Sequence, residues 1–171
     1  MRCDVIVRPA ARGDCPAITE IYRVAVLAGT GSFEIEPPDE AEMARRFEAI
    51  VAGGFPYLVA TRGADFLGFA YANAFRARAA FRYTIEDSIY VAAGNQRAGV
   101  GRMLLGELIG QSRERGFREM IAVIGDSANV ASIALHRAFG FKDAGTLTAV
   151  GYKYGLWLDA VLMQLSLNDR F

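Results

Sequence analysis

The chain has 171 residues, of which 53% are hydrophobic and 22% are charged, and its 19 basic and 19 acidic side chains give a net charge of zero. This composition indicates one globular domain over residues 1–171, and the neutral balance argues against a nucleic-acid-binding protein, which needs a basic excess. No apolar run approaches the ~18 residues of a membrane span, and the N-terminus does not form a signal peptide. Cys3 and Cys15 lack partners at metal-ligand spacing. We therefore expect a cytoplasmic protein with no metal site, disulfide framework or membrane partner.

The first strand and helix are marked by proline and by helical spacing. Residues 4–10 have the composition of a short strand that Pro9 ends. A helix is expected over residues 14–29, with Asp14 as its N-cap and Pro16 in its first turn. Its buried face is predicted by apolar residues at helical spacing: Ile18, Ile21, Tyr22, Ala25 and Val26.

A second helix and a β-hairpin follow a loop that contains glycine and proline. Asp39 begins the helix and Gly53 and Gly54 end it. The apolar residues that share one face of this helix are Met43, Phe47, Ile50 and Val51. Residues 56–75 contain two β-runs joined by a short Gly-containing turn, which predicts an antiparallel hairpin.

Residues 82–93 predict a strand with one apolar face, because successive side chains of a strand point to opposite sides. The apolar face holds Ile85, Ile89 and Val91, and the opposite face holds Glu86, Ser88 and Tyr90. Asp87 has the parity of the apolar face. It is therefore expected to reach the layer on that side or to pair with an arginine.

The C-terminal half alternates helix and strand. A long helix is expected over residues 97–115, buried along Val100, Met103, Leu104 and Leu108. A strand at 117–125, a short helix at 129–141 broken by Gly140, and strand-like runs over 146–167 follow. Strand, turn, helix and strand in the centre predict a parallel pair joined by a right-handed crossover.

A glycine-rich turn with Gly99 and Gly101 lies directly before the long helix. The N–H groups at a helix N-terminus, together with the helix dipole, favour an anion such as a pyrophosphate. Glycine permits close approach of the phosphates, and Arg97 and Arg102 add positive charge. The pattern is neither a P-loop nor a dinucleotide-binding fingerprint. In isolation, an ordinary turn explains it equally well.

Two motifs in a fixed order carry a family resemblance. The segment "QRAGVG", through Gln96, Gly99 and Gly101, matches the pattern [RQ]xxGx[GA], and "NVASIALHRAFGF" is similar to Asn-xx-Ala/Ser-xx-Leu-Tyr-xxx-Gly-Phe. Together they resemble the GNAT superfamily of acetyl-CoA-dependent N-acetyltransferases. Further segments, including "FRYTIEDSIYV" and "GTLTAVGYKYGLWLD", resemble its phosphinothricin and methionine sulfoximine acetyltransferase branch.

The resemblance implies a GNAT-like α/β (α+β) fold. Its sheet is mixed, mostly antiparallel and twisted, with about seven strands, flanking helices and a splayed central parallel strand pair. It also implies acetyl-CoA as the cosubstrate. Contacts to the pantetheine arm are then expected from the backbone of Ile89, Tyr90 and Val91. Contacts to the pyrophosphate are expected from Arg97, Ala98, Gly99, Val100, Gly101 and Arg102. Asn129 resembles the coenzyme A-contacting asparagine of the family, with Ser132 assisting, although an N-cap role explains Asn129 too.

Acetyl transfer to an amine needs a base, because an α-amine with a pKa of ~8 is mostly protonated at neutral pH. Glu86 lies on the polar face of its strand and matches a glutamate of the branch, so we predict that it is this base. Asp87 is the second candidate, and a solvated or ion-paired strand residue is the alternative for Glu86. The resemblance implies that an N–H near Tyr90 or Val91 meets the oxyanion.

His136 is the only histidine in the chain. It occupies the motif position at which much of the superfamily has a tyrosine that protonates the coenzyme A thiolate, and imidazolium could do the same. A surface or core histidine is the alternative. Tyr152 and Tyr154 are further candidates for the acid that protonates the thiolate, and we call them the reserve acids.

Three arginines, Arg76, Arg78 and Arg82, precede Glu86 in the region where the branch binds its substrate. A guanidinium suits the carboxylate of a small amino acid. The alternative, for at least one of the three arginines, is that it is a solvated loop residue with no role in binding. Asp87 and Ser88 are further candidates for substrate contacts, and Phe33 for a pocket wall. The branch resemblance also implies a homodimer, with residues 151–157 reaching the partner's site.

The leading interpretation is an N-acetyltransferase for the α-amine of a small amino acid or analogue, such as phosphinothricin or methionine sulfoximine, by direct attack in a ternary complex. A protein or peptide N-acetyltransferase on the same fold is the nearer rival. A non-catalytic acyl-CoA-binding module is the rival from another class.

Overall fold

The computed structural model describes residues 4–168, so the expectations for Cys3 lie outside the described residues. Seven strands form one sheet in the order β1-β2-β3-β4-β5-β7-β6. The strands are β1 (Ile6–Pro9), β2 (Tyr57–Arg62), β3 (Asp65–Ala74), β4 (Thr84–Val91), β5 (Glu119–Gly125), β6 (Lys142–Lys153) and β7 (Leu156–Ser166). Neighbouring strands are antiparallel except for β4 and β5, which are parallel. This confirms the predicted mixed sheet and its central parallel pair.

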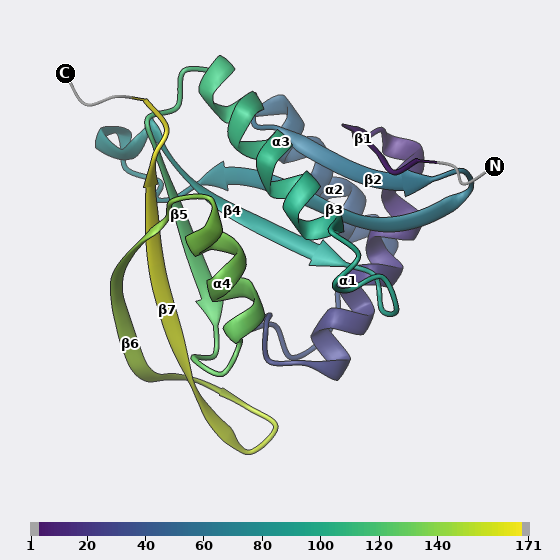
Figure 1. Ribbon diagram of the computed structural model, residues 1–171. Coiled ribbons are helices and arrows are strands. Elements are labelled where there is room, and N and C mark those ends of the chain that lie inside the picture. The colour runs from purple at the N-terminus through teal and green to yellow at the C-terminus, as the bar shows by residue number, and fades with distance from the viewer. Residues whose placement is uncertain (1–3, 169–171) are drawn as a thin grey trace.

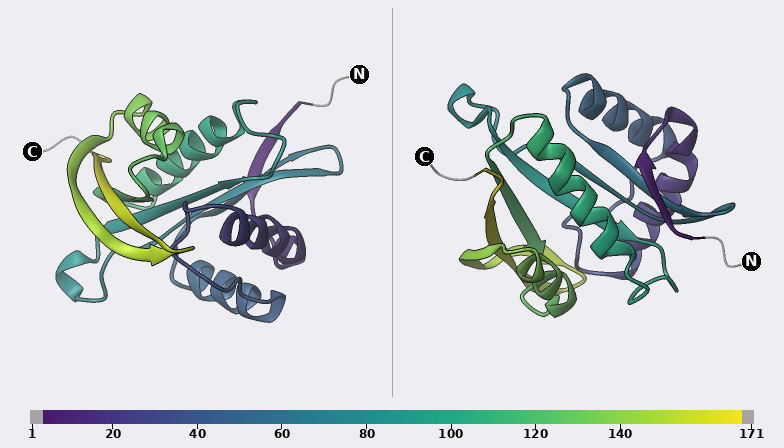
Figure 2. Two further views of the ribbon diagram at one scale, coloured as in Figure 1. Left: turned by 90° about the horizontal axis from the view of Figure 1, so that it is seen from below. Right: turned by 45° about the horizontal axis from the view of Figure 1, so that its top comes forward.

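Four α-helices flank the sheet: α1 (Cys15–Ala28), α2 (Glu40–Ala52), α3 (Val100–Glu114) and α4 (Val130–Ala138). Two short 3-10 helices, η1 (Arg12–Asp14) and η2 (Ala79–Phe81), were not predicted. Helices α1 and α2 cover one face of the sheet, and α3 and α4 lie on the other (Figure 2). No helix within residues 4–168 is long and apolar enough to cross a membrane.

The alternation of side chains along the strands divides the core into two layers. On the α3 side, Leu104 and Leu108 pack in one cluster with Ile85 of β4. On the α1–α2 side, Ile18 and Phe47 share a second cluster with residues of β2 and β3. Both layers bury large apolar side chains completely, and this burial is the main favourable term in folding.

Two local predictions are wrong, and a third is confirmed in position only. Val51 and Met103 were assigned to buried faces but are 47% and 42% exposed, because each lies at the edge of its apolar stripe. Asp14 stands at the N-cap of α1, yet its carboxylate accepts hydrogen bonds from Arg8 instead of capping the helix. Asp39, in contrast, caps α2 as predicted by accepting from the Glu42 N–H at 2.8 Å.

The parallel pairing of β4 and β5 is short. The ladder runs from Thr84–Glu119 to Asp87–Ala122, and beyond it the two strands diverge (Figure 1). This is the splay implied by the family resemblance, and we call its closed end, at the Asp87–Ala122 pair, the vertex.

Candidate active site

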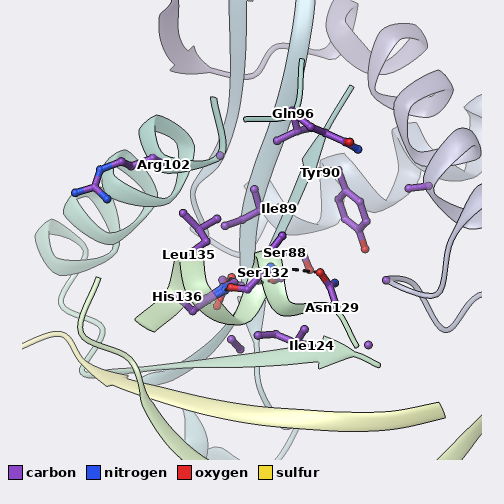
Figure 3. A pocket seen from close by; sticks show the side chains of 18 of the residues that line it. Ser88, Ile89, Tyr90, Gln96, Arg102, Ile124, Asn129, Ser132, Leu135 and His136 are labelled. Atoms are coloured by element: carbon purple, nitrogen blue, oxygen red, sulfur yellow. Dashed lines mark hydrogen bonds and ion pairs between the residues drawn. The ribbon is translucent and has the colours of Figure 1, made fainter. Parts of the chain in front are cut away.

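A cavity of about 590 Å³ lies in the splay between β4 and β5. Its walls come from β4, the glycine turn before α3, the end of β5 and one side of α4. Figure 3 shows Asn129, Ser132 and His136 of α4 in the same cavity as Ser88 and Ile89 of β4. The vertex residues Asp87 and Ala122 also line it.

The glycine turn has the backbone geometry of an anion site. Gly99 is the N-cap of α3 with φ +81°, and Arg97 holds φ +65°, a conformation that costs a non-glycine residue roughly 1–2 kcal/mol. The first N–H groups of a helix have no acceptor within it, and alternating backbone conformations of this kind form anion-binding concavities. A Cβ at Gly101 would lie 3.3 Å from the Leu135 side chain, so glycine keeps this turn close to α4.

Most of the residues predicted to contact coenzyme A line the cavity: Ile89, Tyr90, Val91, Arg97, Gly99, Gly101, Arg102, Asn129 and Ser132. Two others do not. Ala98 is exposed, and the Val100 side chain is buried in the α3 layer, so only the backbone of Val100 is available to a ligand. Asn129 also caps α4, accepting from the Ser132 N–H at 3.3 Å.

Sequence reasoning missed the wall formed by the end of β5 and the loop after α1. The cavity is also lined by Ala25, Gly31, Val123, Ile124 and Gly125. A Cβ at Gly125 would lie 2.5 Å from the Thr30 carbonyl oxygen, so glycine is required where this loop crosses β5. The predicted parallel pairing of β4 with β5 could have indicated that residues of β5 line the cavity. Nothing in the sequence located the loop.

Glu86 lies on the other face of β4, as its parity predicted, and does not line the large cavity. Burial raises the pKa of Glu86, the charge of Asp87 raises it further, and Arg76 opposes the shift. Asn73 of β3 is its register partner. That residue lines a second cavity of about 370 Å³, between β2–β3 and the helices α1–α2, together with Tyr22, Glu34, Met43, Arg45, Arg46, Ala49, Ile50, Tyr57 and Tyr71.

Asp87 points into the opposite layer, as the first of its two predicted alternatives has it, and there it pairs with a histidine and not with an arginine. His136 Nε2 lies 2.9 Å from Asp87 Oδ2, and His136 Nδ1 lies 2.8 Å from the Ser132 carbonyl oxygen. Burial lowers the pKa of His136, but the hydrogen bond and charge of Asp87 outweigh it, and the pKa is raised. His136 is therefore a buried, strongly held side chain in the cavity wall, which excludes the surface alternative.

The reserve acids Tyr152 and Tyr154 do not line the large cavity, and neither does Phe33, whereas the predicted substrate residues Asp87 and Ser88 do. The Tyr154 hydroxyl donates to the Val26 carbonyl oxygen at 2.6 Å, and Tyr152 is 57% exposed against Trp157. Phe33 packs against Gly151, where a Cβ would lie 2.7 Å from its ring.

The three arginines are exposed side chains around η2. The Arg76 guanidinium lies 5.0 Å from the Phe75 ring centre, and Arg82 stacks on Tyr83 at 4.6 Å. Of the three, Arg76 is the one whose charge acts on Glu86.

Comparison with known proteins places this chain in a family. The acetyltransferase (GNAT) family matches residues 17–141. The chain is 49% identical to a phosphinothricin N-acetyltransferase of Alcaligenes faecalis, over 98% of this chain and 85% of that protein. It is 39% identical to an L-methionine sulfoximine/L-methionine sulfone acetyltransferase of Salmonella typhimurium, over 96% and 95% of the two chains. It also matches the crystal structure of a phosphinothricin acetyltransferase from Sinorhizobium meliloti in complex with AcCoA, with a TM-score of 0.91, 48% identity, and coverage of 95% of this chain and 88% of that one. The chain belongs to the GNAT family of acetyltransferases.

Proposed function

We propose that this protein transfers the acetyl group of acetyl-CoA to the α-amine of a small amino acid or analogue, of the phosphinothricin or methionine sulfoximine kind. The observation that carries the proposal is the splay cavity, with an anion-binding glycine turn at one end and a buried acid–base pair at its vertex. The named activities of the relatives support the same substrate class, because the matches span nearly the whole chain.

The residues around the cavity fit acetyl-CoA, which supplies an activated acetyl group and a thiolate leaving group. The N–H groups of residues 97–102 suit the pyrophosphate, with Arg97 and Arg102 adding charge. The pantetheine arm can hydrogen-bond to Ile89, Tyr90 and Val91, because β4 no longer pairs with β5 there. Asn129 and Ser132 flank the same channel from α4.

Glu86 is the proposed base. Because its pKa is raised, Glu86 takes a proton from an ammonium group more readily than a fully solvated carboxylate would. The acceptor amine then approaches from the α1–α2 face, while the acetyl group lies in the splay, and an N–H near Tyr90 or Val91 meets the developing oxyanion. His136 is the proposed acid for the leaving sulfur, on the far side of β4.

The acceptor's carboxylate is proposed to bind a guanidinium from the segment before β4. Arg76 is the best supported, because its charge reaches Glu86. Arg78, Arg82 and Ser88 remain candidates for further contacts. Phe33 and Asp87 are the weakest substrate candidates, because Phe33 packs on β6 and Asp87 pairs with His136.

The function is tested by supplying purified protein with acetyl-CoA and a panel of amines and measuring free thiol release. Phosphinothricin and methionine sulfoximine should be acetylated, whereas N-terminal peptides should not. Turnover of peptides alone would favour the protein acetyltransferase. Acetyl-CoA binding without turnover of any amine would favour the binding module.

The variant Glu86→Gln should lower kcat/KM by about 10²-fold or more, in the range of general base catalysis. Its affinity for acetyl-CoA should be unchanged. Glu114→Gln, at an exposed position in the last turn of α3, is the matched control. Full activity of Glu86→Gln would remove Glu86 from the mechanism.

We also infer a single catalytic domain that works as a cytoplasmic homodimer without a metal ion. The dimer is supported by exposed apolar side chains on the β6–β7 hairpin, among them Leu156 and Trp157 at 58% and 68% exposure. Light scattering tests the dimer, and retention of activity in a chelator tests the independence from metal.

A further inference from the structure

The hydrogen bonds of His136 define how many protons the ring carries. A carbonyl oxygen can only accept, so the Nδ1 that lies 2.8 Å from the Ser132 carbonyl carries a proton. The other nitrogen, Nε2, faces Asp87 Oδ2 at 2.9 Å. That contact also needs a proton, held by the ring or by the carboxyl group, because two lone pairs would repel.

The pair is enclosed. The side chains of His136 and Asp87 are 4% and 2% exposed, and the Phe141 ring meets the imidazole edge-on at 4.9 Å. Asp87 Oδ1 is buried and has no hydrogen-bond partner within residues 4–168. An isolated carboxylate would be costly in such a place, so one proton shared between the two groups, with no net charge, is the favourable state.

No other charged side chain forms a hydrogen bond or ion pair with this pair in the described chain. On β4, Glu86 points to the opposite face of the sheet. On α4, the neighbouring Arg137 turns outward to Asp143 at 3.0 Å. The Asp87–His136 hydrogen bond is therefore the contact that holds the second proton of the pair.

The position of the pair connects it to the reaction. Asp87 is the last residue of β4 that pairs with β5, so the pair lies at the vertex, and both of its members line the cavity. We propose that Asp87 is a positioning residue that keeps His136 doubly protonated, and that the pair supplies the proton taken up by the departing coenzyme A sulfur. This inference rests on the proposed acetyl transfer.

The protons and bonds balance as follows. Glu86 first takes one proton from the ammonium group and passes it to solvent. The carbon–nitrogen bond of the amide then forms, Glu86 takes the second proton that the nitrogen loses, and the carbon–sulfur bond breaks with its electrons passing to sulfur. Sulfur competes with Asp87 Oδ2 for the His136 Nε2 proton and takes it. Glu86 then releases one proton to solvent, the pair regains one from solvent, and the enzyme is restored.

Because the chain has one histidine, nitrogen NMR of tag-free protein labelled in histidine reports on His136 alone. Both ring nitrogens should still carry protons above pH 6.5, the ordinary pKa of histidine. In Asp87→Asn, whose amide has no negative charge to stabilise an imidazolium, the second ring proton should be lost at lower pH. A wild-type ring with a single proton at pH 6.5 would overturn the inference.

Kinetics supply the second arm. Asp87→Asn and His136→Gln should each lower kcat by about 10²-fold while leaving the KM for acetyl-CoA within about twofold. The double variant should be no slower than the worse single variant, because the two residues act as one unit. Asp143→Asn, which removes the exposed partner of Arg137, is the control.

The outcomes separate the two proposals. If wild-type protein acetylates no amine, the proposed function fails, and the NMR titration still decides whether the pair holds the proton. If amines are acetylated but Asp87→Asn keeps the wild-type kcat, only the present inference fails.

Discussion

Two adjacent acidic residues on β4 have opposite surroundings. Glu86 faces the α1–α2 layer, where burial raises its pKa, and Asp87 faces α4, where it meets His136. Strand parity predicted this division from the sequence. The partner of Asp87 could not be predicted, because the strand and helix that meet there are 49 residues apart and no local pattern records the contact.

The charge of Arg76 should control the pH dependence of the reaction. The base must be deprotonated, so a raised pKa moves the acid limb of kcat/KM above pH 4.5, the ordinary pKa of glutamate. Arg76 opposes that rise, and Arg76→Gln should therefore shift the limb to higher pH. Arg115→Gln, at an exposed position after α3, is the control. An unshifted limb in Arg76→Gln would show that Glu86 is not the titrating group.

At the scale of the elements, the order of strands and helices was predictable, because each element has a clear spacing of apolar residues or is ended by glycine or proline. The errors fall where a residue lies at the edge of an apolar stripe, as Met103 does. Asp14 is at the predicted N-cap of α1, but its carboxylate binds Arg8 and does not cap the helix. The loop wall of the cavity was missed for a related reason. A close approach between Gly125 and Thr30 leaves no periodic signal in the sequence.

The contact between the end of β5 and the loop after α1 should be sensitive to one methyl group. Gly125→Ala places a Cβ 2.5 Å from a backbone oxygen that cannot swing aside, and overpacking of this kind costs roughly 1–3 kcal/mol. Urea unfolding should show this loss, together with a fall in kcat/KM. Gly110→Ala, in open space inside α3, should instead be neutral or stabilising by about 0.5–1 kcal/mol.

At the scale of the molecule, the C-terminal hairpin holds the N-terminal part of the active site. The Lys153 Nζ donates to the Ser32 carbonyl oxygen at 2.8 Å, and the Tyr154 hydroxyl donates to the Val26 and Leu27 carbonyl oxygens. These contacts join residues more than a hundred positions apart. They fix the loop that carries Gly31 into the cavity wall.

Lys153 should give the hairpin contact a measurable pH dependence. Burial lowers the pKa of Lys153 below its ordinary 10.5. Between the two values the unfolded chain binds more protons than the folded one, so the free energy of unfolding should rise with pH in that window. Relative to Lys153→Met, wild-type protein should therefore gain stability as the pH rises towards 10.5 in urea titrations. Lys142→Met, which replaces an exposed lysine of β6, controls for loss of charge, and a flat difference would contradict the prediction.

The splay has a consequence for the protein without its ligand. Past Asp87 and Ala122, β4 and β5 no longer satisfy each other's backbone groups, so the sheet has two open edges in its middle as well as those at its rims. Open strand edges invite the addition of extended segments from other chains. If the acetyl donor binds in the splay as proposed, we expect it to cover these inner edges and thereby to protect the protein from aggregation.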